Sequence, residues 1–279
     1  MQNYVKTILL LGILSVLFIT VGGLVGGRDG ILFAFIFSLI VNGSAYFFSD
    51  RLALAASGAK PLKKSEAPEL YQIIEELTRK MNIPMPKLYI VPTKQANAFA
   101  TGRDPNHASV AVTEGILDVL SKEELRGVLA HELAHVKNRD ILISSIAAVL
   151  ASSISFIANM GLYGGFGRNN NEENRSAGIV GLLIALLIPI AASIIQLAIS
   201  RQREFGADEA GAKTIGDGKP LANALLAIHA STKKSPMHIN PAYSSLYIDN
   251  PIGGVGGTLL NLFSTHPPVD ERVKRLLSL

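Results

Sequence analysis

The stretch Ser121–Asn138 reads SKEELRGVLAHELAHVKN and predicts the helix around which the rest of the fold is arranged. Ser121 and Glu124 form the S-x-x-E pattern of a capping box, in which two side chains satisfy backbone N–H groups at a helix start. Apolar residues then recur at helical spacing. The same helix carries His131 and His135, which are four residues apart and therefore lie on one face.

The segment His131-Glu132-Leu133-Ala134-His135 fits the H-E-x-x-H pattern of zinc peptidases. Two imidazoles one turn apart can bind a zinc ion at about 2.0–2.1 Å each, and Glu132 can reach a water on the metal. The chain has no cysteine, so only His, Asp and Glu remain as ligands. We therefore expect one Zn²⁺ per chain. The alternative is a solvated helix face whose two histidines bind nothing.

A catalytic zinc ion usually has three protein ligands and one open position. The metzincin spacing is excluded, because Asn138 and Ile141 occupy the positions where that class has glycine and a third histidine. Glu204, within SRQREFGAD at residues 200–208, is the candidate third ligand. Asp208 follows four residues later and could accept the outer N–H of a zinc-bound histidine. The alternative for this pair is an ordinary charged helix face.

The composition indicates a membrane protein. Of the 279 residues, 48% are hydrophobic and only 17% are charged, with a mean hydropathy of +0.32, whereas a soluble domain has about 25% charged residues. These values exclude a disordered chain, a collagen-like chain and an ordinary soluble domain. Uncharged apolar stretches long enough to span a bilayer occupy residues 7–25, 31–48, 141–167 and 177–199. The alternatives are a cleaved signal peptide for the first stretch and two buried core helices for the last two.

The candidate ligands flank the last two apolar stretches, which restricts the topology. If only one stretch crossed the bilayer, His135 and Glu204 would be separated by about 30 Å of hydrocarbon. Zinc binding therefore requires zero or two crossings. With two crossings, ten lysines and arginines near the ends of the stretches lie on one side of the membrane and three on the other. The positive-inside rule predicts that the side with ten is cytoplasmic. The ten are Lys6, Arg51, Lys60, Lys63, Lys64, Lys137, Arg139, Arg201, Arg203 and Lys213, and the three are Arg28, Arg168 and Arg175.

The chain is therefore expected to consist of four parts. We expect a transmembrane hairpin at residues 1–48, a cytoplasmic part with the H-E-x-x-H helix at 49–140, a second hairpin at 141–199, and a cytoplasmic part with the third ligand at 200–279. The protein should then be a multi-pass protein of the cell membrane with a cytoplasmic active site. Its partners should be the lipid bilayer and membrane-protein substrates, and not nucleic acid.

Local patterns predict further elements in the two cytoplasmic parts. A helix is expected with Ser65 as its N-cap, Pro68 in its first turn and apolar residues at helical spacing up to Met81. Short strands are expected over 87–91, 96–101 and 109–113, and a turn over 102–107. Near the C-terminus, Val269–Leu279 is expected to be helical, with Arg272 on its solvated face. The alternative is that Arg272 pairs with a carboxylate of the site. Residues 233–257, rich in Gly, Pro, Ser and Asn, are expected to form a loop over or near the cleft.

Three motifs together resemble those of a known family. HELAH at 131–135, SRQREFGAD at 200–208 and THPP at 265–268 are similar to motifs of the bacterial HtpX membrane metalloproteases, gluzincin-type peptidases related to the CaaX prenyl proteases. The resemblance covers nearly the whole chain, without a departure at the metal positions. It implies a mainly α fold with a small β-sheet, in which multi-pass membrane helices accompany a cytoplasmic zincin-like metalloprotease domain.

The resemblance also implies roles for individual residues. His131, His135 and Glu204 would bind zinc, and Glu132 would activate a zinc-bound water. The implied function is stress-related quality control, in which misfolded or damaged membrane proteins are hydrolysed on the cytoplasmic side. The rival functions are a CaaX-type processing protease, which would need more spans, and a non-enzymatic membrane scaffold with structural zinc, which would need a fourth ligand.

Two further features are assigned through the resemblance. Asn97, Ala98, Phe99 and Ala100 would form an edge strand with which a substrate backbone pairs, and the alternative is an ordinary strand. Asp208 and His266 would support the site from outside the ligand set. His266 could stabilise the oxyanion, brace Asp208 or simply precede the C-terminal helix.

Overall fold

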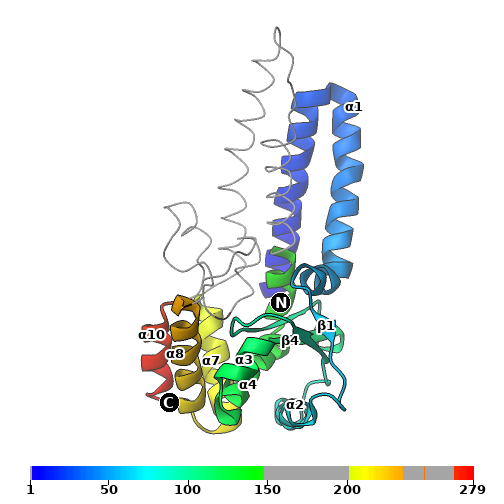
Figure 1. Cartoon of the computed structure of the whole chain (residues 1–279). Coiled ribbons are helices and arrows are strands. Elements are labelled where there is room, and N and C mark those ends of the chain that lie inside the picture. Colours follow the sequence, from blue (N-terminus) through cyan, green and yellow to red (C-terminus); the bar gives the residue numbers. More distant parts are fainter. Residues whose placement is uncertain (1, 148–200, 235–247, 249–266) are drawn as a thin grey trace.

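A computed structural model describes residues 2–147, 201–234, 248 and 267–279 (Figure 1). Most of the apolar stretch 141–167 and all of 177–199 therefore lie outside the described residues. The same holds for His266 and for all but three residues of the expected loop at 233–257. The described part is mainly helical with one small mixed sheet, which confirms that part of the expected fold.

Helix α1 (Gln2–Ala56) consists of two arms joined by a sharp bend at Gly27. The φ angle of Gly27 is 56°, in the left-handed region, which glycine adopts more easily than other residues because it has no Cβ. The arms form a hairpin (Figure 1). Near the bend, Gly22 and Gly30 approach so closely that a Cβ on either would overlap the other's backbone. The second arm, Gly26–Ala56, is long and apolar enough to cross a membrane, judged by length and composition alone, and it continues beyond residue 48.

Large apolar side chains cover the outside of this hairpin. Ile8 and Phe33, for example, are 70% and 72% exposed. A continuous exposed apolar surface marks a contact with a membrane or a partner. The hairpin therefore has the surface that a bilayer requires.

The sheet has four strands in the order β1-β2-β4-β3. They are β1 (Lys60–Pro61), β2 (Lys87–Val91), β3 (Ala98–Gly102) and β4 (Ala108–Thr113). Strands β2 and β4 are parallel, whereas β1 pairs antiparallel with β2 and β3 antiparallel with β4. Strand β3 is thus an edge strand of the described sheet. The short helix η1 (Pro105–His107) lies in the turn between β3 and β4.

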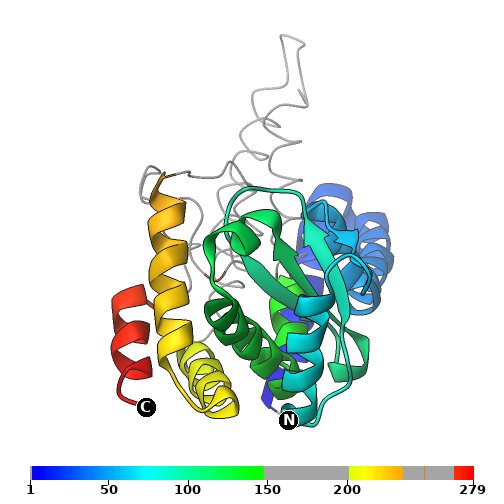
Figure 2. The same ribbon diagram turned by 60° about the horizontal axis from the view of Figure 1, so that its bottom comes forward.

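Helices surround the sheet and form the core with it. They are α2 (Pro68–Met81), α3 (Glu114–Val119), α4 (Lys122–Asn138), α7 (Arg201–Ile215), α8 (Lys219–Lys234) and α10 (Val269–Leu276). Helix α4 is central, since it packs against α7, α8, α2 and β3. Its residues Leu129 and Leu133 are fully buried beside Ile74 and Leu77 of α2. Figure 2 shows α8 and α10 together, on the opposite side of the molecule from α1.

Most local predictions match the described elements. The capping box of Ser121 and Glu124 is present, and β2 has the predicted bounds. Helix α2 begins at Pro68 with Ala67 as its N-cap, so the prediction that Ser65 caps this helix was wrong. Strand β3 begins two residues later than predicted, and β4 one residue earlier. Strand β1 and helix α3 were not predicted, because two and six residues carry too little periodicity to indicate an element.

Candidate metal centre

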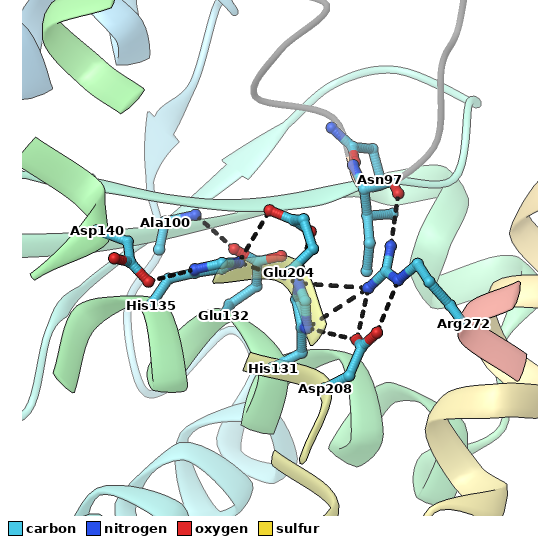
Figure 3. A network of polar contacts seen from close by, with 10 residues as sticks. Asn97, Ala100, His131, Glu132, His135, Asp140, Glu204, Asp208 and Arg272 are labelled. Carbon is cyan, nitrogen blue, oxygen red and sulfur yellow. Dashed lines mark hydrogen bonds and ion pairs between the residues drawn. The ribbon is translucent and has the colours of Figure 1, made fainter. Parts of the chain in front are cut away.

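Helices α4 and α7 bring the three candidate ligands together (Figure 3). The Nε2 atoms of His131 and His135 lie 3.2 Å apart. From Glu204, Oε2 lies 3.6 Å from Nε2 of His131, and Oε1 lies 3.5 Å from Nε2 of His135. The helices approach closely because α7 has Gly211 at the contact, where a Cβ would lie 3.0 Å from the backbone nitrogen of His131. The three side chains therefore converge on one point.

The separations fit a metal ion. Two ligand atoms at about 2.0–2.1 Å from a tetrahedral zinc ion lie about 3.3–3.4 Å from each other. Within residues 2–147, 201–234, 248 and 267–279, these three residues form a group whose ligand atoms all lie within 4.8 Å of one another. Two imidazoles and one carboxylate match the donor set of a catalytic zinc site with one open position.

Each histidine has a carboxylate at its outer nitrogen. Nδ1 of His131 lies 2.9 Å from Oδ1 of Asp208, and Nδ1 of His135 lies 3.1 Å from Oδ2 of Asp140. A carboxylate at Nδ1 favours the tautomer that leaves the Nε2 lone pair available to a metal. Asp208 was expected in such a role from its spacing, whereas Asp140 was missed. Asp140 directly follows Arg139, which ends α4 in the left-handed conformation.

Arg272 is a buried part of this network, so the prediction of a solvated position was wrong and the alternative, pairing with a site carboxylate, is confirmed. Its guanidinium donates to both oxygens of Asp208, at 2.9 and 2.7 Å, and its side chain has no exposed surface. Burial would raise the pKa of Asp208, but Arg272, together with His131, lowers it to about 2. Helix α10 packs on α7 and α8, and this tertiary contact buries a side chain that the local sequence pattern places in solvent.

The catalytic candidate Glu132 is also buried and lies beside β3. Its Oε2 accepts a hydrogen bond from the backbone N–H of Ala100, at 2.9 Å. Burial is the main reason why the pKa of Glu132 is raised. For His135, burial lowers the pKa, but the carboxylates of Glu204, Asp140 and Glu132 outweigh it and raise the value to about 9. The cluster is therefore rich in negative charge, which favours a bound cation.

Comparison with known proteins gives the family. A model of peptidase family M48 matches residues 64–279, a range that contains the whole cluster. The chain belongs to peptidase family M48. It is 50% identical to a protease HtpX homolog from Sulfurihydrogenibium sp., over 99% of this chain and 96% of that protein. It is 51% identical to a protease HtpX homolog from Thermodesulfovibrio yellowstonii, over 99% of this chain and 98% of that protein.

A solved structure has a similar fold. The crystal structure of S. mikatae Ste24p matches with a TM-score of 0.52 and 19% identity, over 99% of this chain and 65% of the length of that one. This likeness concerns the fold alone. The family match and the full-length relatives make this M48 chain a membrane metalloprotease, which confirms the family and the activity that its motifs indicated.

The candidate substrate strand lies next to the cluster of this M48 peptidase. Ala98, Phe99 and Ala100 belong to β3, and Asn97 immediately precedes it. The Asn97 side chain accepts a hydrogen bond from the backbone N–H of Ile248, at 3.1 Å, while Arg272 donates to the carbonyl of Ile248, at 3.2 Å. Ile248 thus joins the edge strand to the buried arginine, a connection with no signal in the sequence.

Proposed function

We propose that the chain is a zinc-dependent endopeptidase that hydrolyses peptide bonds of misfolded or damaged membrane proteins on the cytoplasmic side of the cell membrane. The observation that carries the proposal is the convergence of His131, His135 and Glu204 at 3.2–3.6 Å, directly beside the buried carboxylate of Glu132. Two imidazoles, a carboxylate and an adjacent general base are the parts that metal-assisted amide hydrolysis requires.

The residues have separate roles in this mechanism. A bound zinc ion supplies Lewis acidity and lowers the pKa of a water toward about 7. Glu132 takes the proton from the attacking water and passes it to the leaving amine, for which its raised pKa is suited. Asp208 and Asp140 each accept the Nδ1 proton of an imidazole, that of His131 and that of His135 respectively. They thereby favour the tautomer whose Nε2 has a free lone pair that faces the site. His266, which lies outside the described residues, is a further candidate for support of the oxyanion.

We propose that substrates bind as an added strand along β3. Strand β3 pairs with β4 on one side only, and the backbone N–H of Ala100 already faces Glu132 on the other. An extended substrate on that side would exchange backbone hydrogen bonds with Asn97–Ala100 and lie next to the general base. Backbone pairing accepts many sequences, which suits an enzyme that removes damaged proteins.

The proposed membrane arrangement is the four-part division at residues 1–48, 49–140, 141–199 and 200–279. The hairpin of α1 supports the first crossing pair. Because His135 and Glu204 lie 3.5 Å apart, the 68 residues between them (204 − 135 − 1) must cross the bilayer either not at all or twice. The two apolar stretches at residues 141–167 and 177–199, each long enough to span, favour two crossings. The excess of Lys and Arg on that side supports a cytoplasmic active site.

The test uses the full chain, purified in detergent, with casein and a model membrane protein as substrates. We expect cleavage that a chelator abolishes and that added zinc restores. Glu132→Ala should retain zinc and lose cleavage, whereas Glu204→Gln should lose most of its zinc. The controls are Glu123→Ala and Glu209→Gln, which change exposed glutamates on the same two helices.

Each rival function predicts a different result. Zinc loss in Glu132→Ala, or unchanged zinc in Glu204→Gln, would refute the assigned roles. Zinc-loaded protein that cleaves neither substrate would instead favour a membrane scaffold. Cleavage restricted to prenylated C-terminal peptides would favour a CaaX-type processing protease.

A further inference from the structure

A polar pocket lies away from the metal centre, where the foot of α1 meets the sheet. It has a volume of about 190 Å³ and is lined by the end of α1, Met85 and the start of β2, the turn between β3 and β4, and the start of β4. Figure 1 shows the lower end of the hairpin beside this sheet. We call it the interfacial pocket; its lining includes Tyr46, Arg51, Lys87, Arg103 and His107. None of these residues takes part in the proposed proteolysis.

Three basic residues from separate elements are among the residues that line the interfacial pocket. Arg51 comes from α1, Lys87 from β2, and Arg103 from the turn after β3. Bringing three cations to one hollow costs electrostatic free energy unless an anion neutralises them. In the part of the chain that the structure describes, neither Arg51 nor Lys87 forms an ion pair with a carboxylate.

The carboxylates near the interfacial pocket do not balance this charge. Asp104 lies 3.6 Å from Arg103, but its side chain also accepts hydrogen bonds from the backbone N–H groups of Asn106 and His107 and contacts the His107 ring. Asp50 is the only acidic residue among the pocket's lining residues. The three cations therefore leave a net positive charge that a small anion could neutralise.

The position of the interfacial pocket suggests the source of that anion. Exposed large apolar side chains of the second arm of α1 continue down to Phe47 and Phe48 and end at Leu52, and Asp50 and Arg51 lie between them. The pocket thus begins where the apolar surface ends, which is the level of the lipid headgroups if this arm crosses the membrane. Tyr46 and Phe47 in its wall are aromatic residues, and tyrosine in particular is enriched at that level.

We propose that the interfacial pocket binds the phosphate of an anionic phospholipid headgroup from the cytoplasmic leaflet. Its volume is below the about 300–1,000 Å³ of pockets for drug-sized ligands, so it suits a phosphate with its glycerol and not an acyl chain. The acyl chains lie along the apolar surface of α1. Because the turn that carries Arg103 joins β3 to β4, the bound headgroup also links the membrane surface to the sheet of the protease.

The test measures lipid binding by the full chain in a neutral detergent, by calorimetric titration with short-chain phosphatidylglycerol. We expect it to bind at least tenfold more tightly than phosphatidylcholine with the same acyl chains. A basic residue near an anionic lipid surface contributes about 1 kcal/mol, which is about fivefold in affinity. Arg51→Gln, Lys87→Gln and Arg103→Gln should each weaken binding by about fivefold, and Asp50→Asn should strengthen it at least twofold.

The controls remove the same charge outside the interfacial pocket. Lys60→Gln, Lys63→Gln and Lys122→Gln change exposed lysines and should leave the affinity within twofold. The gain in Asp50→Asn cannot arise from misfolding, and casein cleavage by every variant provides a separate check of the fold. Binding and proteolysis are measured independently, so failure of one does not imply failure of the other.

Three results would overturn the proposal. The first is equal affinity for phosphatidylglycerol and phosphatidylcholine. The second is a loss of affinity in the lysine controls as large as in the pocket variants. The third is binding of inorganic phosphate or glycerol phosphate as tight as that of the lipid, which would assign the pocket to a soluble anion.

Discussion

Arg272→Met removes the cation that neutralises the buried carboxylate of Asp208. The Arg272 guanidinium donates two hydrogen bonds to the Asp208 carboxylate, at 2.9 and 2.7 Å. Arg272 is 0% exposed and Asp208 is 3% exposed. Methionine retains much of the volume but donates no hydrogen bond, so Asp208 keeps a buried charge whose main counter-ion is gone. Removing one partner of a buried ion pair costs about 3–5 kcal/mol. At about 2–4 °C per kcal/mol, the melting temperature should fall by about 6–20 °C.

The assay is thermal unfolding of the full chain in detergent at a fixed zinc concentration. Lys274→Met is the matched control, because Lys274 lies on the same helix and is exposed, and its melting temperature should change by less than about 1 °C. Combining Arg272→Met with Asp208→Asn removes the isolated charge and keeps an acceptor for His131. The double variant should therefore melt at least about 2 °C above Arg272→Met alone.

Two results would refute this reasoning. A fall in melting temperature of less than about 3 °C in Arg272→Met would mean that the buried pair contributes little to stability. A double variant less stable than Arg272→Met would mean that the cost does not come from the isolated charge of Asp208.

Three further variants test other parts of the structure. Asp140→Asn removes the charged partner of His135 and should weaken zinc binding by about 10–100-fold in a competition titration, with Asp118→Asn as the exposed control. Gly127→Ala should destabilise the protein by about 1–3 kcal/mol in spite of the gain in helix propensity, because the new Cβ would lie 2.7 Å from the backbone nitrogen of Leu221. An unchanged melting temperature would contradict this close contact. Ser121→Ala should cost about 1 kcal/mol through loss of the cap on α4, and equal stability would mean that this helix end needs no cap.

The local sequence was sufficient where all the information lies within one helix. His131 and His135 could be recognised because both occur in a helix whose start is marked by Ser121 and Glu124, and a spacing of four fixes their common face. The apolar periodicity of α2 likewise indicated a helix that reaches Met81, whereas its N-cap is Ala67 and not the predicted Ser65. Glu204 required one additional argument, which was that a zinc site needs a third ligand on the same side of the membrane.

Among the partners of these residues, Asp208 was expected from its spacing, but the sequence did not identify Asp140 as the partner of His135 and did not favour the burial of Arg272. Asp140 directly follows Arg139, which adopts the left-handed conformation at the end of α4, and its carboxylate contacts His135. Arg272 lies in an eight-residue helix that is rich in charged residues, so its sequence indicated a solvated face. Its burial arises from the packing of α10 on α7 and α8.

The two polar parts of the chain, residues 49–140 and 200–279, form one structural unit in the fold. In the sequence, residues 49–140 and 200–279 are separated by two long apolar stretches. In the fold, α4 from the first half packs against α7 and α8 from the second, and they share one core. Arg272 then connects Asp208, which contacts the candidate metal ligand His131, to Ile248, and Ile248 is hydrogen-bonded to Asn97 at the edge strand. Neither half can therefore form the metal centre alone, because the first lacks Glu204 and the second lacks both histidines.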